Sequence, residues 1–170
     1  SFLLSPMTVI RPDDRILSRP VLIERRRQLR QQGHKVVFTN GCFDLLHRAH
    51  VEYLWESRQL SDLLIVGLNS DVSVRTLKGS GRPLVPQEDR AALLVALRSV
   101  DYLCLFDEES VESLVADLLP DVLVKGGDYR LDQIVGRESV EKAGGQVKTL
   151  SLWRDSSTST LIHKIRQLPL

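Results

Sequence analysis

Short apolar runs alternate along the chain with stretches in which apolar residues recur every three or four positions. The runs, which we predict to be strands, cover residues 35–39, 63–68, 102–106, 122–124 and 147–152. The run at 63–68 is apolar throughout, which is typical of a parallel strand that is buried on both faces. The stretches between the runs have the spacing of helices that pack one face against a core.

Six helices are predicted from these stripes and from helix start and stop signals. Their markers are Ser18 to Gly33; Val51, Leu54 and Trp55; Pro86 with Leu93, Leu94 and Leu97 on the inner face; Val111, Leu114, Val115 and Leu118; residues 131–143; and residues 156–160 followed by Leu161, Ile165 and Leu168. The stretch from residue 69 to residue 85 contains Gly79, Gly81 and Pro83 and is predicted to be a loop.

Alternating strands and helices require crossover connections, which produce a mostly parallel sheet with helices on both faces. We therefore predict a Rossmann-like α/β fold with one five-stranded domain. Residues 1–33 are assigned to an N-terminal arm and helix, and residues 34–170 to the domain. Ligands of such sheets bind at the carboxyl ends of the strands, so functional residues are expected just after each strand.

Composition and charge exclude some classes of partner. The chain has 23 basic and 22 acidic side chains, and this balance argues against nucleic acid or a membrane surface as a partner. No apolar run approaches the roughly 20 residues of a membrane span. Two cysteines without a recognisable spacing fit a reducing compartment, so a cytoplasmic location is expected. The arginines between residues 25 and 30 are interpreted as a solvated helix face, with a phosphate or partner patch as the alternative.

The first predicted strand leads into two histidines at the start of a helix. Gly41 permits a tight turn, and His47 and His50 lie on one helix face because they are three residues apart. A helix N-terminus offers free amides and partial positive charge, so this place suits phosphate, whose oxygens the histidines can bind as donors. By themselves the two histidines are also compatible with metal ligation, although no Cys, Asp or Glu completes a zinc set nearby, or with an ordinary helix start.

Further motifs follow in order along the chain. They are Thr39-Asn40-Gly41-Cys42-Phe43-Asp44, Asn69-Ser70-Asp71, Arg75-Thr76-Leu77-Lys78-Gly79, Gly81-Arg82-Pro83, Gln87-Glu88-Asp89-Arg90, Val124-Lys125-Gly126-Gly127-Asp128-Tyr129 and Ser157-Thr158-Ser159. With the two histidines, this combination resembles the HxGH nucleotidyltransferase superfamily in its cytidylyltransferase-like branch. Within that branch it is similar to the D-glycero-β-D-manno-heptose 1-phosphate adenylyltransferases, which occur alone or as the C-terminal half of bifunctional kinase/adenylyltransferases. The resemblance covers about residues 35–167, so residues 34–170 are expected to be the nucleotidyltransferase domain.

The resemblance implies a role for each motif. The residues expected to be catalytic are His47, His50 and Lys78. Those expected to bind the nucleotide are Thr39, Asn40, Gly41, Phe43, Asp44, Lys125, Gly126, Gly127, Asp128, Ser157, Thr158 and Ser159. Those expected to bind the acceptor substrate are Asn69, Asp71, Arg82 and Arg90. The resemblance implies no protein ligand to a metal, and Mg²⁺ is expected as a cofactor that binds mainly through the nucleotide phosphates.

Several of these residues also have a purely structural interpretation. The hydroxyls of Ser157 and Thr158 are what any helix N-cap requires. Arg90 either binds phosphate or pairs with Glu88 or Asp107. The remaining structural alternatives are a solvated side chain for Lys78, loop-holding for Asp44 and Asp71, and packing for Cys42. Trp55 and Trp153 are interpreted as core or rim residues rather than stacking platforms.

One position departs from the family pattern. The family has Gly between the two histidines, where it lets the nucleotide approach the backbone closely, whereas this chain has Ala49. Alanine adds one methyl group and is the better helix former, so the change is expected to be tolerated.

The implied reaction transfers AMP from ATP to a sugar 1-phosphate and releases pyrophosphate. The acceptor oxygen is already anionic, so positioning and charge stabilisation suffice. One alternative is a cytidylyltransferase acting on glycerol 3-phosphate or a related polyol phosphate. Another is a nucleotide-binding module with impaired catalysis, for which Ala49 is the only argument. A plain Rossmann dehydrogenase is disfavoured because the first strand–helix turn has no G-x-G-x-x-G.

The expected partners are therefore ATP and a sugar phosphate, without nucleic acid or membrane. A homodimer is one assembly that is open to the chain.

Overall fold

The computed structural model describes residues 10–127, 129–152 and 157–169, in which five strands form one parallel sheet. The strands are β1 (Val36–Gly41), β2 (Leu63–Asn69), β3 (Tyr102–Phe106), β4 (Val122–Gly126) and β5 (Gln146–Leu150). Their spatial order is β3-β2-β1-β4-β5, and every neighbouring pair is parallel. The order reverses between β1 and β4, because the chain first builds outward from β1 through β2 to β3 and then returns to the other side of β1. The prediction of a Rossmann-like, five-stranded parallel domain is confirmed.

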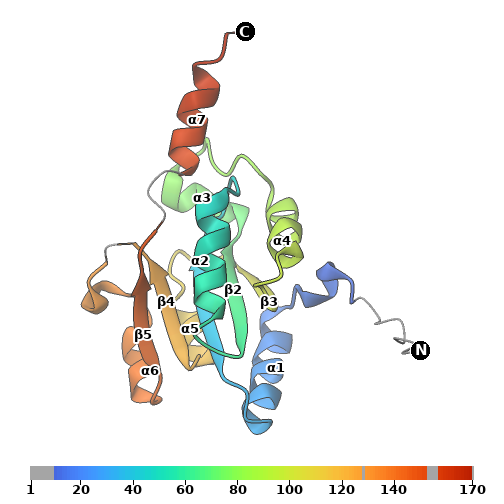
Figure 1. Ribbon diagram of the computed structural model, residues 1–170, viewed down its shortest axis with the longest axis vertical. Helices are drawn as coiled ribbons and strands as arrows, with labels where there is room; N and C mark the ends of the chain where they lie inside the picture. The colour runs from blue at the N-terminus through green and yellow to red at the C-terminus, as the bar shows by residue number, and fades with distance from the viewer. Residues whose placement is uncertain (1–9, 128, 153–156, 170) are drawn as a thin grey trace, which may run out of the picture.

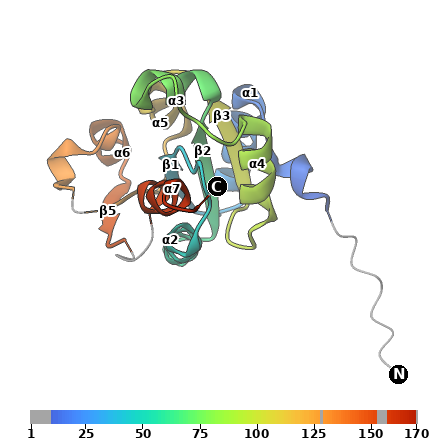
Figure 2. The same ribbon diagram turned by 90° about the horizontal axis from the view of Figure 1, so that it is seen from above.

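Helices cover both faces of this sheet (Figures 1 and 2). On one face lie α1 (Arg19–Gln31), α5 (Glu112–Leu118) and α6 (Arg137–Lys142), whose apolar side chains share a core cluster with Phe38 and Ile65. On the other lie α2 (Arg48–Arg58) and α4 (Gln87–Ala96), which pack on Val37 and Val66. Two shorter 3-10 turns are η1 (Pro12–Arg15) and η2 (Leu131–Gln133). Helices α3 (Asp71–Lys78) and α7 (Thr158–Arg166) lie beyond the carboxyl ends of the strands.

The N-terminal helix α1 belongs to the same core as the rest of the described chain. Leu22 is completely buried, and Arg26 is only 3% exposed. The Arg26 guanidinium donates to the Asp121 carboxylate at 2.9 Å and to the backbone oxygen of Leu119 at 3.0 Å. The prediction of a solvated arginine face is therefore wrong at Arg26, because that side chain ties α1 to the start of β4.

Several predicted stripes differ from the observed inner faces of the helices. On α2 the buried side chains include Tyr53 and Leu54, whereas Val51 and Trp55 are 42% and 53% exposed. On α4 Leu94 is buried but Leu93 is half exposed. The helix turns Tyr53 inward because the Tyr53 hydroxyl bonds to partners on two buried strands, which spacing alone cannot reveal.

Two segment boundaries also differ from the prediction. The expected loop after β2 contains helix α3, which Ser70 caps by accepting a hydrogen bond from the Ser73 amide and which ends at Gly79 with a φ of 94°. The expected helix over residues 131–143 is divided into η2 and α6, with Gly136 between them at a φ of 86°. The last helix, α7, exists as expected, but Ile165 and Leu168 of its predicted stripe are 58% and 65% exposed.

Candidate active site

The turn between β1 and α2 brings the two histidines together. His47 is the N-cap residue of α2, and His50 lies in the first turn. Their rings stack with centroids 3.8 Å apart, and the Phe43 ring meets His50 edge-on at 5.2 Å. Gly41 makes room for this arrangement, because a Cβ at that position would lie 2.9 Å from the Phe43 ring.

Both histidine rings carry an unsatisfied polar atom. The Nδ1 atoms of His47 and His50 are buried and have no hydrogen-bond partner among the described residues. Burial lowers the pKa of both rings, and burial together with the charge of His47 lowers the pKa of His50 to about 4. Both rings are therefore neutral near pH 7 in the free protein, and each has one N–H to donate. A buried polar atom without a partner costs free energy, so this pair is suited to a ligand with exposed oxygens.

A cavity of about 880 Å³ opens at this point, at the carboxyl ends of the strands. It lies where the strand order reverses between β1 and β4, which is where ligands of open parallel sheets bind. The sequence-predicted residues that line it are Asn40, Gly41, Phe43, Asp44, His47, His50, Asn69, Lys78, Arg82, Lys125, Ser157, Thr158 and Ser159. Ala49 lines it as well, with a side chain that is 3% exposed.

Positive charge converges on this cavity from three elements. Lys78 comes from the end of α3, Arg82 from the following loop and Lys125 from β4. Burial lowers the pKa of Lys125, and the positive charge of Lys78 lowers it further. Two ammonium groups that repel each other in one cavity favour a polyanionic ligand between them.

Helix α7 contributes its capped N-terminus. The Ser157 hydroxyl accepts the Thr160 amide at 3.0 Å, so the expected N-cap is present. The Thr158 hydroxyl points to the backbone oxygen of Leu45 at 3.4 Å, which links α7 to the loop before His47. The first turn of a helix presents amides that favour anions, and here that turn borders the cavity.

Some predicted nucleotide-binding residues lie behind the cavity wall. Thr39 is fully buried, and its hydroxyl bonds to the Tyr53 hydroxyl at 2.6 Å. Gly126 is the last residue of β4, and the amide of Gly127, which follows it, donates to the backbone oxygen of Leu150. These three residues shape the site from beneath. Asp128 lies outside the described residues.

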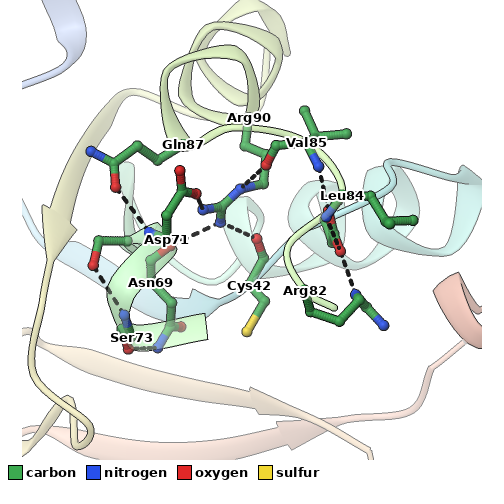
Figure 3. A network of polar contacts seen from close by, with 11 residues as sticks. Cys42, Asn69, Asp71, Ser73, Arg82, Leu84, Val85, Gln87 and Arg90 are labelled. Carbon is green, nitrogen blue, oxygen red and sulfur yellow. Dashed lines mark hydrogen bonds and ion pairs between the residues drawn. The ribbon is translucent and has the colours of Figure 1, made fainter. Parts of the chain in front are cut away.

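Arg90 forms the centre of a buried polar network (Figure 3). Its guanidinium makes four hydrogen bonds, to the backbone oxygens of Val85, Cys42 and Asn69 and to the Asp71 carboxylate at 2.7 Å. The side chain is 0% exposed. The sequence analysis gave an ion pair with Glu88 or Asp107 as one alternative for Arg90, and the structure shows that its ion pair is with Asp71 instead. A direct contact between Arg90 and phosphate does not fit this burial, so Arg90 acts on the site through the backbone that it holds.

Asp44 organises the loop on the other side of this network. Its carboxylate accepts the amides of Leu84 and Val85 and pairs with Arg82 at 2.5 Å. Burial raises the pKa of this carboxyl, but the two amides and the Arg82 guanidinium together hold the pKa below its usual value. The ionised Asp44 therefore fixes the loop that carries Arg82 over the cavity.

Sequence reasoning missed a second group of cavity residues. Those that carry polar side chains are Glu109, Ser110 and Gln133. Tyr129, which was quoted only as part of a motif, and Cys42, which was assigned to packing, also border the cavity. Glu109 and Ser110 follow β3, so the rule that function lies after each strand would have found them. Gln133 lies in η2, within the segment 131–143 that was predicted to be one helix, and no sequence signal marked it as functional.

Among residues 10–127, 129–152 and 157–169, no group of three His, Cys, Asp or Glu side chains is placed to hold a metal ion. The described helices include none that is long and apolar enough to cross a membrane.

These features together define a nucleotidyltransferase. They are a parallel sheet with an anion-suited cavity where the strand order reverses, two stacked histidines at a helix start, and two lysines that line the same cavity. The chain belongs to the cytidylyltransferase-like family, whose model matches residues 38–164.

Curated relatives agree with this assignment. The chain is 55% identical over 134 residues to a bifunctional protein HldE from Geobacter sulfurreducens, covering 79% of this chain and 27% of that protein. It is 49% identical over 153 residues to the HldE of Trichlorobacter lovleyi, covering 90% of this chain and 31% of that protein. The chain thus spans about a third of the length of these relatives.

Two solved structures resemble the fold. A lipopolysaccharide core biosynthesis protein from Thermoplasma volcanium has a TM-score of 0.58 and 30% identity, with 73% of this chain and all of that chain covered. A pantoate-beta-alanine ligase from Francisella tularensis has a TM-score of 0.61 at 13% identity, covering 82% of this chain and 67% of that chain, and this likeness concerns the fold alone.

Proposed function

We propose that this domain transfers the adenylyl group of ATP to D-glycero-β-D-manno-heptose 1-phosphate, forming ADP-heptose and pyrophosphate. The observation that carries the proposal is the pair of stacked, half-buried histidines, whose buried Nδ1 atoms have no partner among the described residues, in one cavity with two lysines. The identity to HldE proteins and to a lipopolysaccharide core biosynthesis protein supports the heptose acceptor and a role in lipopolysaccharide core synthesis.

In the proposed reaction an oxygen of the sugar phosphate attacks the α-phosphorus of ATP. A P–O bond forms to the acceptor, the bond between the α-phosphorus and its bridging oxygen breaks, and pyrophosphate leaves with that electron pair. The neutral imidazoles of His47 and His50 each donate one N–H to phosphate oxygens, and Lys78 and Lys125 balance the charge that develops on them. No side chain has to accept a proton, since the acceptor oxygen is anionic.

Mg²⁺ fits this site as a companion of the nucleotide rather than as a tightly held ion. Both carboxylate oxygens of Asp44 are occupied by amides and Arg82, so phosphate oxygens would be its main ligands. When bound, the ion supplies charge neutralisation at the phosphates.

The test is release of pyrophosphate from the purified protein with Mg²⁺ and each of ATP, CTP, GTP and UTP in turn, with either the heptose 1-phosphate or glycerol 3-phosphate as the acceptor. Release with ATP alone and an ADP-sugar product supports the proposal, whereas release with CTP and glycerol 3-phosphate would replace it by the cytidylyltransferase alternative. His50→Gln should lower kcat by about 100-fold, as loss of one charge-stabilising donor does. The exposed His34, changed to Gln, is the matched control and should leave kcat unchanged.

Two further parts of the proposal concern the setting of the enzyme. ATP and sugar phosphates are substrates of the cytoplasm, so we place the protein there. The homodimer stays a prediction, and sedimentation of the purified protein would test it.

A further inference from the structure

Most of the side chains that the sequence assigned to the acceptor make hydrogen bonds within the protein. Arg90 and Asp71 bond to each other, and Arg82 bonds to Asp44. The Asn69 side chain donates to the Ser73 hydroxyl at 2.9 Å. Arg90 and Asp71 do not line the cavity and are committed to each other, whereas Arg82, among the described residues, bonds to Asp44 through Nε alone and keeps its two terminal nitrogens for a ligand.

The segment after β3 supplies a free carboxylate at the same cavity. Of the two adjacent glutamates there, Glu108 is turned away, because its side chain pairs with Arg19 at 2.5 Å. The backbone oxygen of Glu108 accepts the Ser73 hydroxyl at 3.0 Å, which fixes the segment against α3. Glu109 follows directly and lines the cavity, and within the described part of the chain its side chain has no hydrogen bond or ion pair.

Ser110 and Gln133 extend this polar edge. The Ser110 hydroxyl oxygen accepts the Glu112 amide at 3.2 Å, which leaves its proton free to donate to a ligand. Gln133 lines the cavity from η2 beside the buried Ile134, and its side-chain amide bonds to no other described residue. A carboxylate, a hydroxyl and an amide thus border the cavity at an exposed rim on the side of α5 and α6, and Ser110 and Gln133 also border a second cavity.

The walls around these groups are apolar. Phe106, Val111 and Ile134 are each 5–7% exposed and line the cavity next to them. Apolar walls with a few convergent polar groups are the usual construction of a small-molecule site, and they suit the C–H faces of a sugar between its hydroxyls.

Side chains of both charges line the cavity. The histidines, Lys78 and Lys125 suit phosphates, whereas the carboxylate of Glu109 repels them and binds hydroxyl donors instead. Resting on the proposed function, we propose that Glu109, Ser110 and Gln133 form the subsite that binds the hydroxyl groups of the sugar acceptor. The nucleotide then occupies the end formed by α2 and α7.

The test compares Michaelis constants for the two substrates in Glu109→Ala and in the control Glu112→Ala. Glu112 begins α5 three residues later and lines a neighbouring cavity with Ser110 and Gln133, but it does not line this one. The control therefore removes an equal charge close by without removing a side chain of this cavity. Glu109→Ala should raise KM for the heptose 1-phosphate by about tenfold or more, as loss of a charged hydrogen bond does, and leave KM for ATP unchanged. The control should leave both constants unchanged. A rise in KM for ATP would instead assign Glu109 to the nucleobase, and no change in either constant would also overturn the proposal.

Failure of the proposed function is distinguishable from failure of this inference. If the unmodified protein uses CTP and glycerol 3-phosphate, the heptose proposal falls, and the same comparison of KM with glycerol 3-phosphate decides the role of Glu109. If neither pair of substrates turns over, equilibrium titration with the heptose 1-phosphate decides it. At least tenfold weaker binding to Glu109→Ala than to Glu112→Ala supports the subsite, whereas equal binding or no binding by the unmodified protein overturns it.

Discussion

Replacing Arg90 by methionine should destabilise the protein far more than an ordinary arginine substitution. The change removes four hydrogen bonds and the ion pair with Asp71, and it leaves three backbone oxygens without their donor. Methionine is a good helix former of similar length, so helix α4 itself loses little. Breaking a buried pair by removing one partner costs about 3–5 kcal/mol. Because the Asp71 side chain is 25% exposed and water can solvate it, we expect a loss near the lower end of that range.

Urea denaturation followed by circular dichroism measures this difference in the free energy of unfolding. The matched control is Arg137→Met, since Arg137 pairs with Glu141 along one exposed turn of α6 and such pairs contribute under about 1 kcal/mol. Arg90→Lys should fall between the two, because one ammonium group cannot reach all four acceptors. If Arg90→Met and Arg137→Met lose equal stability, the network does not hold the ends of β1 and β2 as argued.

Three further predictions concern backbone, protonation and the motif departure. Gly136→Ala should lower the free energy of unfolding, measured by heat or urea, by about 2–4 kcal/mol, because the φ of Gly136 is 86° and an added Cβ would lie 2.6 Å from Val115. The control is Gly33→Ala, where φ is 82° but the space is open, and it should cost only the backbone strain of about 1 kcal/mol. Burial lowers the pKa of His50 from 6.5 to about 4, so the free energy of unfolding should fall as pH drops from 6.5 towards 4. In urea titrations at several pH values, His50→Gln should make this dependence on pH less steep. An unchanged dependence would contradict the lowered pKa of His50. Ala49→Gly should lower stability by about 1 kcal/mol and change kcat/KM for the nucleotide by less than about tenfold; a larger gain would mean that the methyl group obstructs the nucleotide.

The parts of the molecule that could be predicted are those that local sequence controls. Apolar runs and their spacing predicted the five parallel strands, and the rule for strand ends correctly placed His47, His50 and Lys125 at one edge of the sheet. These side chains belong to segments whose conformation follows from nearby residues, a turn at Gly41 and a strand end at β4.

What could not be predicted depends on contacts between distant segments. Nothing near Arg90 indicates that it bonds to Cys42, 48 residues earlier, and nothing near Tyr53 indicates its bond to Val124, 71 residues later. Glu109 stands beside another glutamate, and only the pairing of Glu108 with Arg19, 89 residues away, distinguishes the two. Side-chain roles that are decided by tertiary partners remain ambiguous in a single sequence.

Helix α7 forms one wall of the site and yet buries none of its described residues. Among the described residues, the hydrogen bond that joins α7 to another segment near the cavity runs from the Thr158 hydroxyl to the backbone oxygen of Leu45, and at 3.4 Å it is long. Segments with so little buried surface open locally at a low free energy, independently of the core. Any ligand that bonds to the cap at Ser157 must therefore also hold the helix closed, and its measured affinity includes that cost. Amide exchange in α7 then becomes a direct gauge of occupancy, with protection that rises with nucleotide concentration while protection in β1 stays constant.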